Sequence, residues 1–199
     1  NAVGIEKTFI YMGIGALVLM LILSQFLVNP PAGYVPVSSG TPKKQAKKTV
    51  STPVRDMGLK DIIKTSSFYR YWIMFMISST AGLMIIAHAA NIAKVQISWE
   101  GGFYLVILLS VFNATGRISG GAISDKIGRV NLMRIIFGLQ AINMLVFTFY
   151  SNVALLALGI AVAGFCYGAS FSVFPATIMD LYGMKHFGAN YGLIMTAWG

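Results

Sequence analysis

Long apolar stretches separated by short polar segments dominate the pattern of this sequence. Complete stretches lie at about residues 8–28, 68–93, 102–123, 132–150 and 153–182, and another begins near residue 187. The first, FIYMGIGALVLMLILSQFLV, carries no charge, and roughly 21 helical residues reach ~31 Å, enough to cross the hydrocarbon core of a bilayer. Because backbone groups in lipid have to pair internally, unbroken runs of this length predict transmembrane helices. The short connections predict that consecutive helices are antiparallel neighbours.

Composition agrees with this pattern. Of the 199 residues, 56% are hydrophobic and 11% are charged, and the mean hydropathy is +0.72. A soluble domain carries about 25% charged residues. We therefore predict an all-α, polytopic membrane protein with five full transmembrane helices and the start of a sixth. Because the chain begins at Asn1 without a methionine and stops at Gly199 inside an apolar run, we expect a fragment of a longer protein.

Residues 30–66 differ from the rest of the chain. Proline, glycine, serine, threonine and lysine are frequent there, which is typical of a solvated linker. Within it, the spacing of the apolar residues predicts a short amphipathic helix at 57–64. The predicted organisation is therefore a single helix at 1–29 that ends one helical half, a central linker at 30–66, and an incomplete C-terminal helical half at 67–199.

The positive charges predict the orientation. If the 30–66 linker is cytoplasmic, twelve of the fifteen Lys and Arg residues lie inside, Lys7 and Lys94 lie outside, and Arg117 lies within a span. This asymmetry follows the positive-inside rule and predicts a multi-pass protein of the cell (plasma or inner) membrane with a cytoplasmic linker. The net charge of +9 flanks apolar segments rather than forming a basic domain, so we expect the lipid bilayer as partner and no nucleic acid.

Arg117 is the most informative single residue. It lies inside an apolar span, eight residues before Asp125 and hence ~12 Å from that charged end along a helix. Asn113, Gly116, Gly120 and Ser124 share its helical face. An arginine in the membrane is costly and normally faces a cavity or a partner, and its guanidinium matches a carboxylate in a bidentate fork. This favours an anion-binding site, and the alternative is an arginine that snorkels to the interface or pairs structurally.

A second informative motif lies between two predicted spans, on the side of the membrane where the Lys and Arg residues are concentrated. Gly121, Asp125, Gly128 and Arg129 form the pattern G-x-x-x-D-x-x-G-R. Gly121 permits a close helix approach, Gly128 permits a tight turn, and Asp125 caps the next helix or accepts from a cation. A surface charge pair of this kind breaks and re-forms at low cost. We therefore interpret the segment as a gating loop, and an ordinary cytoplasmic turn is the alternative.

This motif, in this place, resembles the signature loop of the major facilitator superfamily. Within that superfamily the chain looks like the oxalate–formate antiporter family at FLVNPPAGYVP (26–36), SSFYRYWIMF (66–75), GRISGGAISDKIGR (116–129) and FPATIMDLYGMKHFGANYG (174–192). The resemblance implies that the chain covers the sixth to early eleventh helices of a twelve-helix carrier. It also implies that the missing N-terminal half is a partner of this one.

The resemblance also implies site residues. The family's oxalate exchangers bind a dicarboxylate between an arginine of the eighth helix and a lysine of the eleventh. Arg117 matches the arginine, whereas Trp198 stands where the lysine would be, which favours a monocarboxylate or another anion. Tyr167 and Phe171 match aromatic residues of the tenth helix that line the family's site, and the alternative is that they are ordinary helix-packing aromatics. Asn113 is expected to help shape the pocket.

His88 is a further candidate, because an imidazole titrates near neutral pH and is able to bind substrate or carry a proton. Such a histidine more often bridges helices. No H-E-x-x-H, C-x-x-C, P-loop or nucleophile-elbow motif is present, so we expect no enzyme, and we expect no cofactor and no metal site.

Together these observations predict a secondary transporter that moves a small organic anion by alternating access, as a symporter coupled to protons or as an antiporter with a counter-anion. The expected cargo is a mono- or dicarboxylate of the oxalate or formate kind. The alternatives are a major facilitator transporter of a non-anionic drug or sugar, and a membrane protein that senses or scaffolds without transporting.

Overall fold

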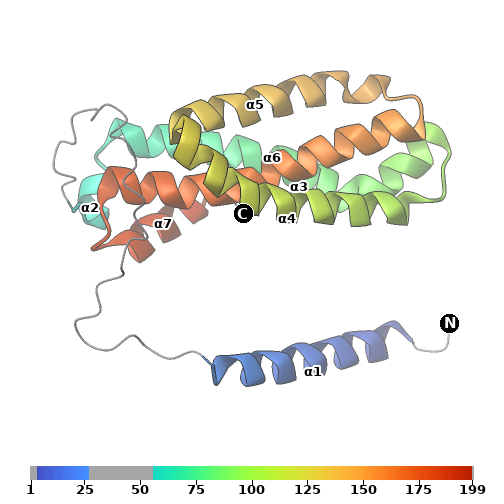
Figure 1. Cartoon of the computed structure of the whole chain (residues 1–199), viewed down its shortest axis with the longest axis horizontal. Coiled ribbons are helices and arrows are strands. Elements are labelled where there is room, and N and C mark those ends of the chain that lie inside the picture. Colours follow the sequence, from blue (N-terminus) through green and yellow to red (C-terminus); the bar gives the residue numbers. More distant parts are fainter. Residues whose placement is uncertain (1–3, 27–55, 199) are drawn as a thin grey trace. The chain divides into compact units, whose positions relative to one another are not determined.

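The computed structural model describes residues 4–26 and 56–198 (Figure 1). The chain divides into two units, residues 1–50 and 51–199. The first contains α1 (Ile5–Ser24), a 20-residue helix that is apolar and uncharged beyond its first turn. It begins three residues before the predicted span and is followed by a turn at Gln25 and Phe26. Most of the predicted linker, residues 30–55, lies outside the described residues.

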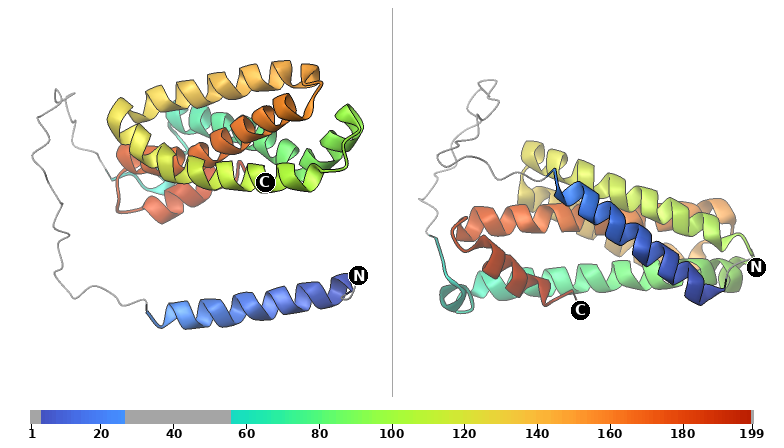
Figure 2. Two further views of the ribbon diagram at one scale, coloured as in Figure 1. Left: turned by 45° about the vertical axis from the view of Figure 1, so that its right-hand side comes forward. Right: turned by 90° about the horizontal axis from the view of Figure 1, so that it is seen from below.

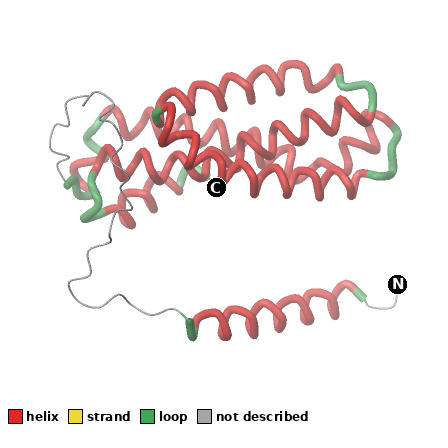
Figure 3. Tube along the Cα trace, in the orientation of Figure 1, coloured by secondary structure: helices red, strands yellow, loops and turns green. Residues whose placement is uncertain are grey.

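The second unit is a bundle of helices, and Figure 3 shows only helices and loops in the described part of the chain. Its elements are α2 (Leu59–Ile62), α3 (Ser66–Ile97), α4 (Gly102–Ile127), α5 (Arg129–Val146), the short 3₁₀ helix η1 (Phe147–Phe149), α6 (Val153–Tyr182) and α7 (Phe187–Met195). The long helices α3 to α6 run up and down the bundle in succession (Figure 2). Short connections enforce this antiparallel order.

Among residues 4–26 and 56–198, five helices are long and apolar enough to cross a membrane: α1, α3, α4, the continuous stretch of α5 with η1, and α6. The all-α prediction is confirmed, and the bounds of α6 agree with the predicted span of 153–182. Other bounds were predicted wrongly, and α5 begins at Arg129, three residues before its predicted span. α3 has 32 residues and extends past both ends of the predicted 68–93 span, and α4 continues through Ile127. Polar residues at these ends remain helical because helical hydrogen bonds also form outside the apolar layer.

The amphipathic helix predicted at 57–64 is present as the short α2. The apolar spacing places Leu59, Ile62 and Ile63 on one side of this helix, and of these Ile62 is fully buried. Leu59 and Ile63 are 42% and 43% exposed. The prediction of a helix is therefore confirmed, but only one of its apolar side chains belongs to the core.

α6 is the central helix of this unit and packs against α3, α4, α5 and α7. It contributes to both hydrophobic clusters of the core. One cluster includes Phe75, Met133 and Phe174, and the other includes Leu109 and Ile160. Because α6 is covered by several neighbours, it needs apolar or small residues on most of its faces.

Glycines bring α4 and α6 into close contact. A Cβ atom added to Gly164 would lie 2.7 Å from the carbonyl oxygen of Leu109, and one added to Gly120 would lie 2.9 Å from the Cα of Ala169. Gly168 packs in the same way against the backbone carbonyl of Asn113. Small residues at such positions allow two helix backbones to approach each other, and this contact fixes the position of Asn113 and its neighbour Arg117.

Candidate functional site

Arg117 lies on α4 at the edge of the contact with α6. The predicted polar stripe of α4 is divided by this contact: Gly116, Gly120 and Ser124 are buried, whereas the Arg117 side chain is exposed. One turn earlier, the Oδ1 atom of Asn113 accepts a hydrogen bond of 3.1 Å from the Nε atom of Arg117. Asn113 therefore orients the guanidinium without neutralising it.

The guanidinium of Arg117 also lies over an aromatic ring of α6. Its Cζ atom is 5.0 Å from the centroid of Phe171, a cation–π geometry. Within the described residues, no carboxylate oxygen lies within 4.0 Å of Arg117. The Nε–H is used by Asn113, and the two terminal nitrogens form no hydrogen bond to described residues. This leaves the fork of donors that a carboxylate requires.

An uncharged aromatic cluster continues from Phe171. The ring of Tyr167 is 4.9 Å from that of Phe171, and the ring of Trp198 meets Phe171 edge-on at 6.4 Å. The Nε1–H of Trp198 donates a hydrogen bond of 2.8 Å to the hydroxyl of Tyr167. Gly82 of α3 makes room for the Tyr167 ring, because a Cβ atom there would collide with it. Helices α3, α4 and α6 and the residues after α7 thus meet at one site.

The structure brings together five of the six predicted binding residues, namely Arg117, Asn113, Tyr167, Phe171 and Trp198. The arrangement offers one positive charge next to neutral aromatic surface. It suits a ligand with one anionic group and an uncharged remainder.

His88 lies elsewhere. It lines a cavity of about 460 Å³ between α3 and α5, together with Asn91, Gln96, Met144 and Phe147. None of the five clustered residues lines this cavity. On this arrangement, His88 is not part of the site around Arg117.

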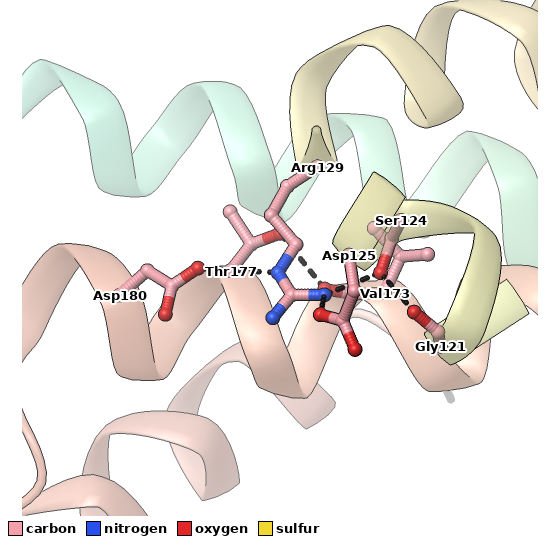
Figure 4. Close-up of polar contacts among 7 residues, drawn as sticks. All are labelled: Gly121, Ser124, Asp125, Arg129, Val173, Thr177 and Asp180. Carbon is pink, nitrogen blue, oxygen red and sulfur yellow. Dashed lines mark hydrogen bonds and ion pairs between the residues drawn. The ribbon is translucent and has the colours of Figure 1, made fainter. Parts of the chain in front are cut away.

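The predicted gating segment forms a charge network at the junction of α4 and α5 (Figure 4). Arg129 pairs with Asp125 at 2.6 Å through Nη1 and with Asp180 of α6 at 3.1 Å through Nε. Its Nη1 also donates to the hydroxyl of Ser124, which in turn donates to the carbonyl of Gly121 at 2.8 Å. One guanidinium therefore connects three helices.

The predicted loop is shorter than expected. Gly121 and Asp125 belong to α4, and Arg129 is the first residue of α5. The connection predicted at 124–131 is reduced to Gly128, whose φ of +92° favours glycine. Asp125 does not cap α5, since the residue preceding that helix is Gly128, without a side-chain cap. A one-residue turn places Arg129 directly above the last turn of α4.

Asp180 was missed by the sequence analysis. It lies in the last turn of α6, where the helix macrodipole disfavours a carboxylate. Arg129 is disfavoured for the same reason at the first position of α5. Two charges at the unfavourable ends of apolar helices indicate that each has a partner, and this signal was available in the sequence. It does not reveal which residue the partner is.

Comparisons with known proteins agree with this architecture. The sequence profile of the Major Facilitator Superfamily matches residues 1–199. The chain is 27% identical to the oxalate:formate antiporter of Oxalobacter formigenes, over 98% of this chain and 44% of the relative. It is also 27% identical to the MFS-type transporter YhjX of Escherichia coli (strain K12), over 100% of this chain and 48% of the relative. Apicoplast pyruvate carrier 1 of Toxoplasma gondii is 29% identical over 76% of this chain and 28% of the relative. The chain thus spans less than half the length of each of these relatives.

Proposed function

Because the chain belongs to the Major Facilitator Superfamily, we propose that the full-length protein is a secondary transporter that moves a small organic anion across the membrane by alternating access. Its helices make it a multi-pass membrane protein. In this proposal the cargo binds reversibly at the cluster around Arg117, and no covalent step is required. The second half of the protein would close the site from the other side.

The observation that carries the proposal is the environment of Arg117. A guanidinium within a predicted membrane span is held by the neutral Asn113 and by the face of Phe171. Placing an unpaired charge within the membrane is costly. A carboxylate that binds the two terminal nitrogens offsets this cost and forms a charge-assisted, bidentate contact. The arginine would therefore serve as the anion anchor.

A monocarboxylate is the substrate class that the cluster favours. Apart from Arg117, the neighbours of Phe171 in this cluster are neutral, and the indole N–H of Trp198 is already used by the hydroxyl of Tyr167. A second carboxylate at this surface would find no cation among the described residues of the cluster, whereas an uncharged remainder fits beside the rings. The names of two relatives, an oxalate:formate antiporter and a pyruvate carrier, also refer to small carboxylates.

We assign the gating role to the charge network around Arg129, which would act as a conformational latch. Its side chain is 25% exposed, and those of Asp125 and Asp180 are 55% and 57% exposed. Pairs that are half-exposed contribute about 0.2–1 kcal/mol each, so they are able to break and re-form during a transport cycle. In this assignment the network, together with Gly121 and Gly128, lies on the cytoplasmic side with the linker. Coupling to protons or to a counter-anion completes the cycle.

Counterflow in proteoliposomes tests the proposal. The full-length protein is reconstituted, and exchange of labelled oxalate, formate, lactate and pyruvate is measured. Arg117→Gln removes both terminal donors, and at about 1.5 kcal/mol for each charged hydrogen bond we expect a loss in apparent affinity on the order of 100-fold. Arg117→Lys keeps the charge but not the fork, so its loss is expected to be smaller.

Lys94→Gln is the matched control, since it removes a cation at the far end of α3, outside the cluster. It is expected to transport normally. Transport that persists in Arg117→Gln would contradict the anchor. If no carboxylate of the panel exchanges, the same assay is repeated with labelled drugs and sugars: their exchange would favour a non-anionic substrate, and the absence of any exchange would favour a sensor or scaffold.

A further inference from the structure

A second basic site lies outside the cluster around Arg117 and outside the network around Arg129. A cavity of about 260 Å³ opens between α3, α5 and the end of α6. Arg70 of α3 and Arg134 of α5 both line it. Its remaining wall is largely apolar and includes Met74, Met133 and Phe137. Two guanidinium groups thus share one pocket with an apolar surface.

Neither arginine is neutralised by the described part of the chain. Arg70 donates to the carbonyl of Ser66 at 3.5 Å and to the hydroxyl of Ser67 at 3.2 Å, both uncharged. Arg134 is exposed and has no hydrogen-bond partner among the described residues. No carboxylate oxygen in the described ranges lies within 4.0 Å of either guanidinium. Arg129, at the same end of the bundle, has two such partners.

The ends of three helices contribute partial charges at this cavity. α3 and α5 both begin at this end, at Ser66 and Arg129. The residues that precede them, Thr65 and Gly128, provide no side-chain cap. The N-terminal turns of both helices therefore contribute partial positive charge, whereas the last turn of α6, where Leu181 lines the cavity, contributes partial negative charge. Like charges placed together repel each other, and an anion between them relieves this repulsion.

We propose that this cavity binds the phosphate headgroup of an anionic phospholipid, with Arg70 and Arg134 on either side of the phosphate. The apolar wall selects a lipid over free phosphate. Met74 and Phe137 also line a neighbouring cavity of about 410 Å³ between α3 and α5. An acyl chain would extend from the charged mouth along this apolar surface. Basic pockets between transmembrane helices suit lipid headgroups for this reason.

Native mass spectrometry of the full-length protein in detergent tests this site. Phosphatidylglycerol and phosphatidylcholine with the same acyl chains are titrated separately. The double variant Arg70→Gln/Arg134→Gln is compared with Lys126→Gln/Lys185→Gln, which removes the same charge at the same end of the bundle but outside the cavity. Arg134→Gln alone is included because Arg134 supports no described hydrogen bond, so this variant is expected to fold normally. The melting temperature of each variant checks its folding.

Wild-type protein is expected to bind phosphatidylglycerol at least about tenfold more tightly than phosphatidylcholine. This preference is expected to disappear in the double variant, to fall in Arg134→Gln, and to persist in the lysine control. Millimolar inorganic phosphate should leave the lipid bound. Equal binding of the two lipids, an equal loss in the lysine control, or displacement by inorganic phosphate would each overturn the proposal. The proposal would also be overturned if another part of the full-length protein were found to cover this cavity. None of these outcomes depends on the transported substrate.

Discussion

Replacing Trp198 with lysine tests how the neutral surface around Arg117 sets the charge of the cargo. In the structure, Trp198 contacts Phe171 edge-on at 6.4 Å, and the guanidinium of Arg117 lies 5.0 Å from the centroid of the same ring. The two side chains therefore occupy neighbouring places around one aromatic ring. Trp198→Lys would add a second cation there, which we expect to bind the second carboxylate of a dicarboxylate.

The size of the effect follows from the contacts that change. A hydrogen bond to a charged group contributes about 1.5–3 kcal/mol net, which corresponds to a gain of roughly 10- to 150-fold in dicarboxylate affinity relative to monocarboxylate affinity. Separately, the loss of the 2.8 Å hydrogen bond between Trp198 and Tyr167 lowers the free energy of unfolding by about 1 kcal/mol. Repulsion between the new lysine and Arg117 further disfavours the empty site, but it is relieved when two carboxylates bind.

The assay is competition in counterflow, in which unlabelled oxalate and formate compete for exchange of a labelled monocarboxylate. Trp198→Met is the matched control, since it removes the indole and its hydrogen bond and places an uncharged chain of similar length there. We expect oxalate to compete better only in Trp198→Lys. An unchanged ratio of oxalate to formate inhibition in the lysine variant, or an equal change in Trp198→Met, would refute the reasoning.

Two further predictions concern packing and the charge network. Gly164→Ala is expected to destabilise the protein by about 1–3 kcal/mol and to lower its melting temperature, because the new Cβ would lie 2.7 Å from a backbone oxygen of α4. Gly138→Ala, with nothing within 4 Å, is expected to be neutral or to stabilise α5 by up to about 1 kcal/mol, and equal melting temperatures for the two variants would contradict the close helix contact. In a double-mutant cycle of unfolding free energies, Arg129→Gln and Asp180→Asn are expected to couple by about 0.5–1 kcal/mol. A coupling energy of zero would show that this ion pair does not contribute to the stability of the membrane-inserted protein.

Much of the fold was predictable because lipid imposes simple rules on a sequence. The span at 153–182 could be located to the residue, since the polar segments on both sides of it are short and its single charged residue, Asp180, lies in the last turn. The end of α4 was predicted less well. Asp125 and Lys126 look like loop residues by polarity, but a helix continues outside the apolar layer as long as its backbone bonds are satisfied. Hydropathy marks the membrane boundary and not the end of the helix.

The candidate site was only partly predictable for a related reason. Arg117 could be identified from the sequence alone, because a charge within an apolar run is costly wherever the helix packs. The separation of His88 from Arg117 could not be predicted, since both lie on predicted helices and only the direction of each side chain around its axis decides which neighbours it meets. The pairing of Arg129 with Asp180, 51 residues apart, likewise depends on how α5 and α6 pack.

The sequence by itself therefore determined the helices, the membrane as their solvent, and the residue whose charge requires an explanation. These properties follow from local transfer energies, which are summed along the chain without reference to partners. Only the tertiary structure decided that Phe171 lies beside the guanidinium of Arg117 and contacts Trp198, and that Gly120, Gly164 and Gly168 bring α4 against α6. Those contacts depend on the relative rotation and separation of helices, which side-chain packing fixes after the helices have formed.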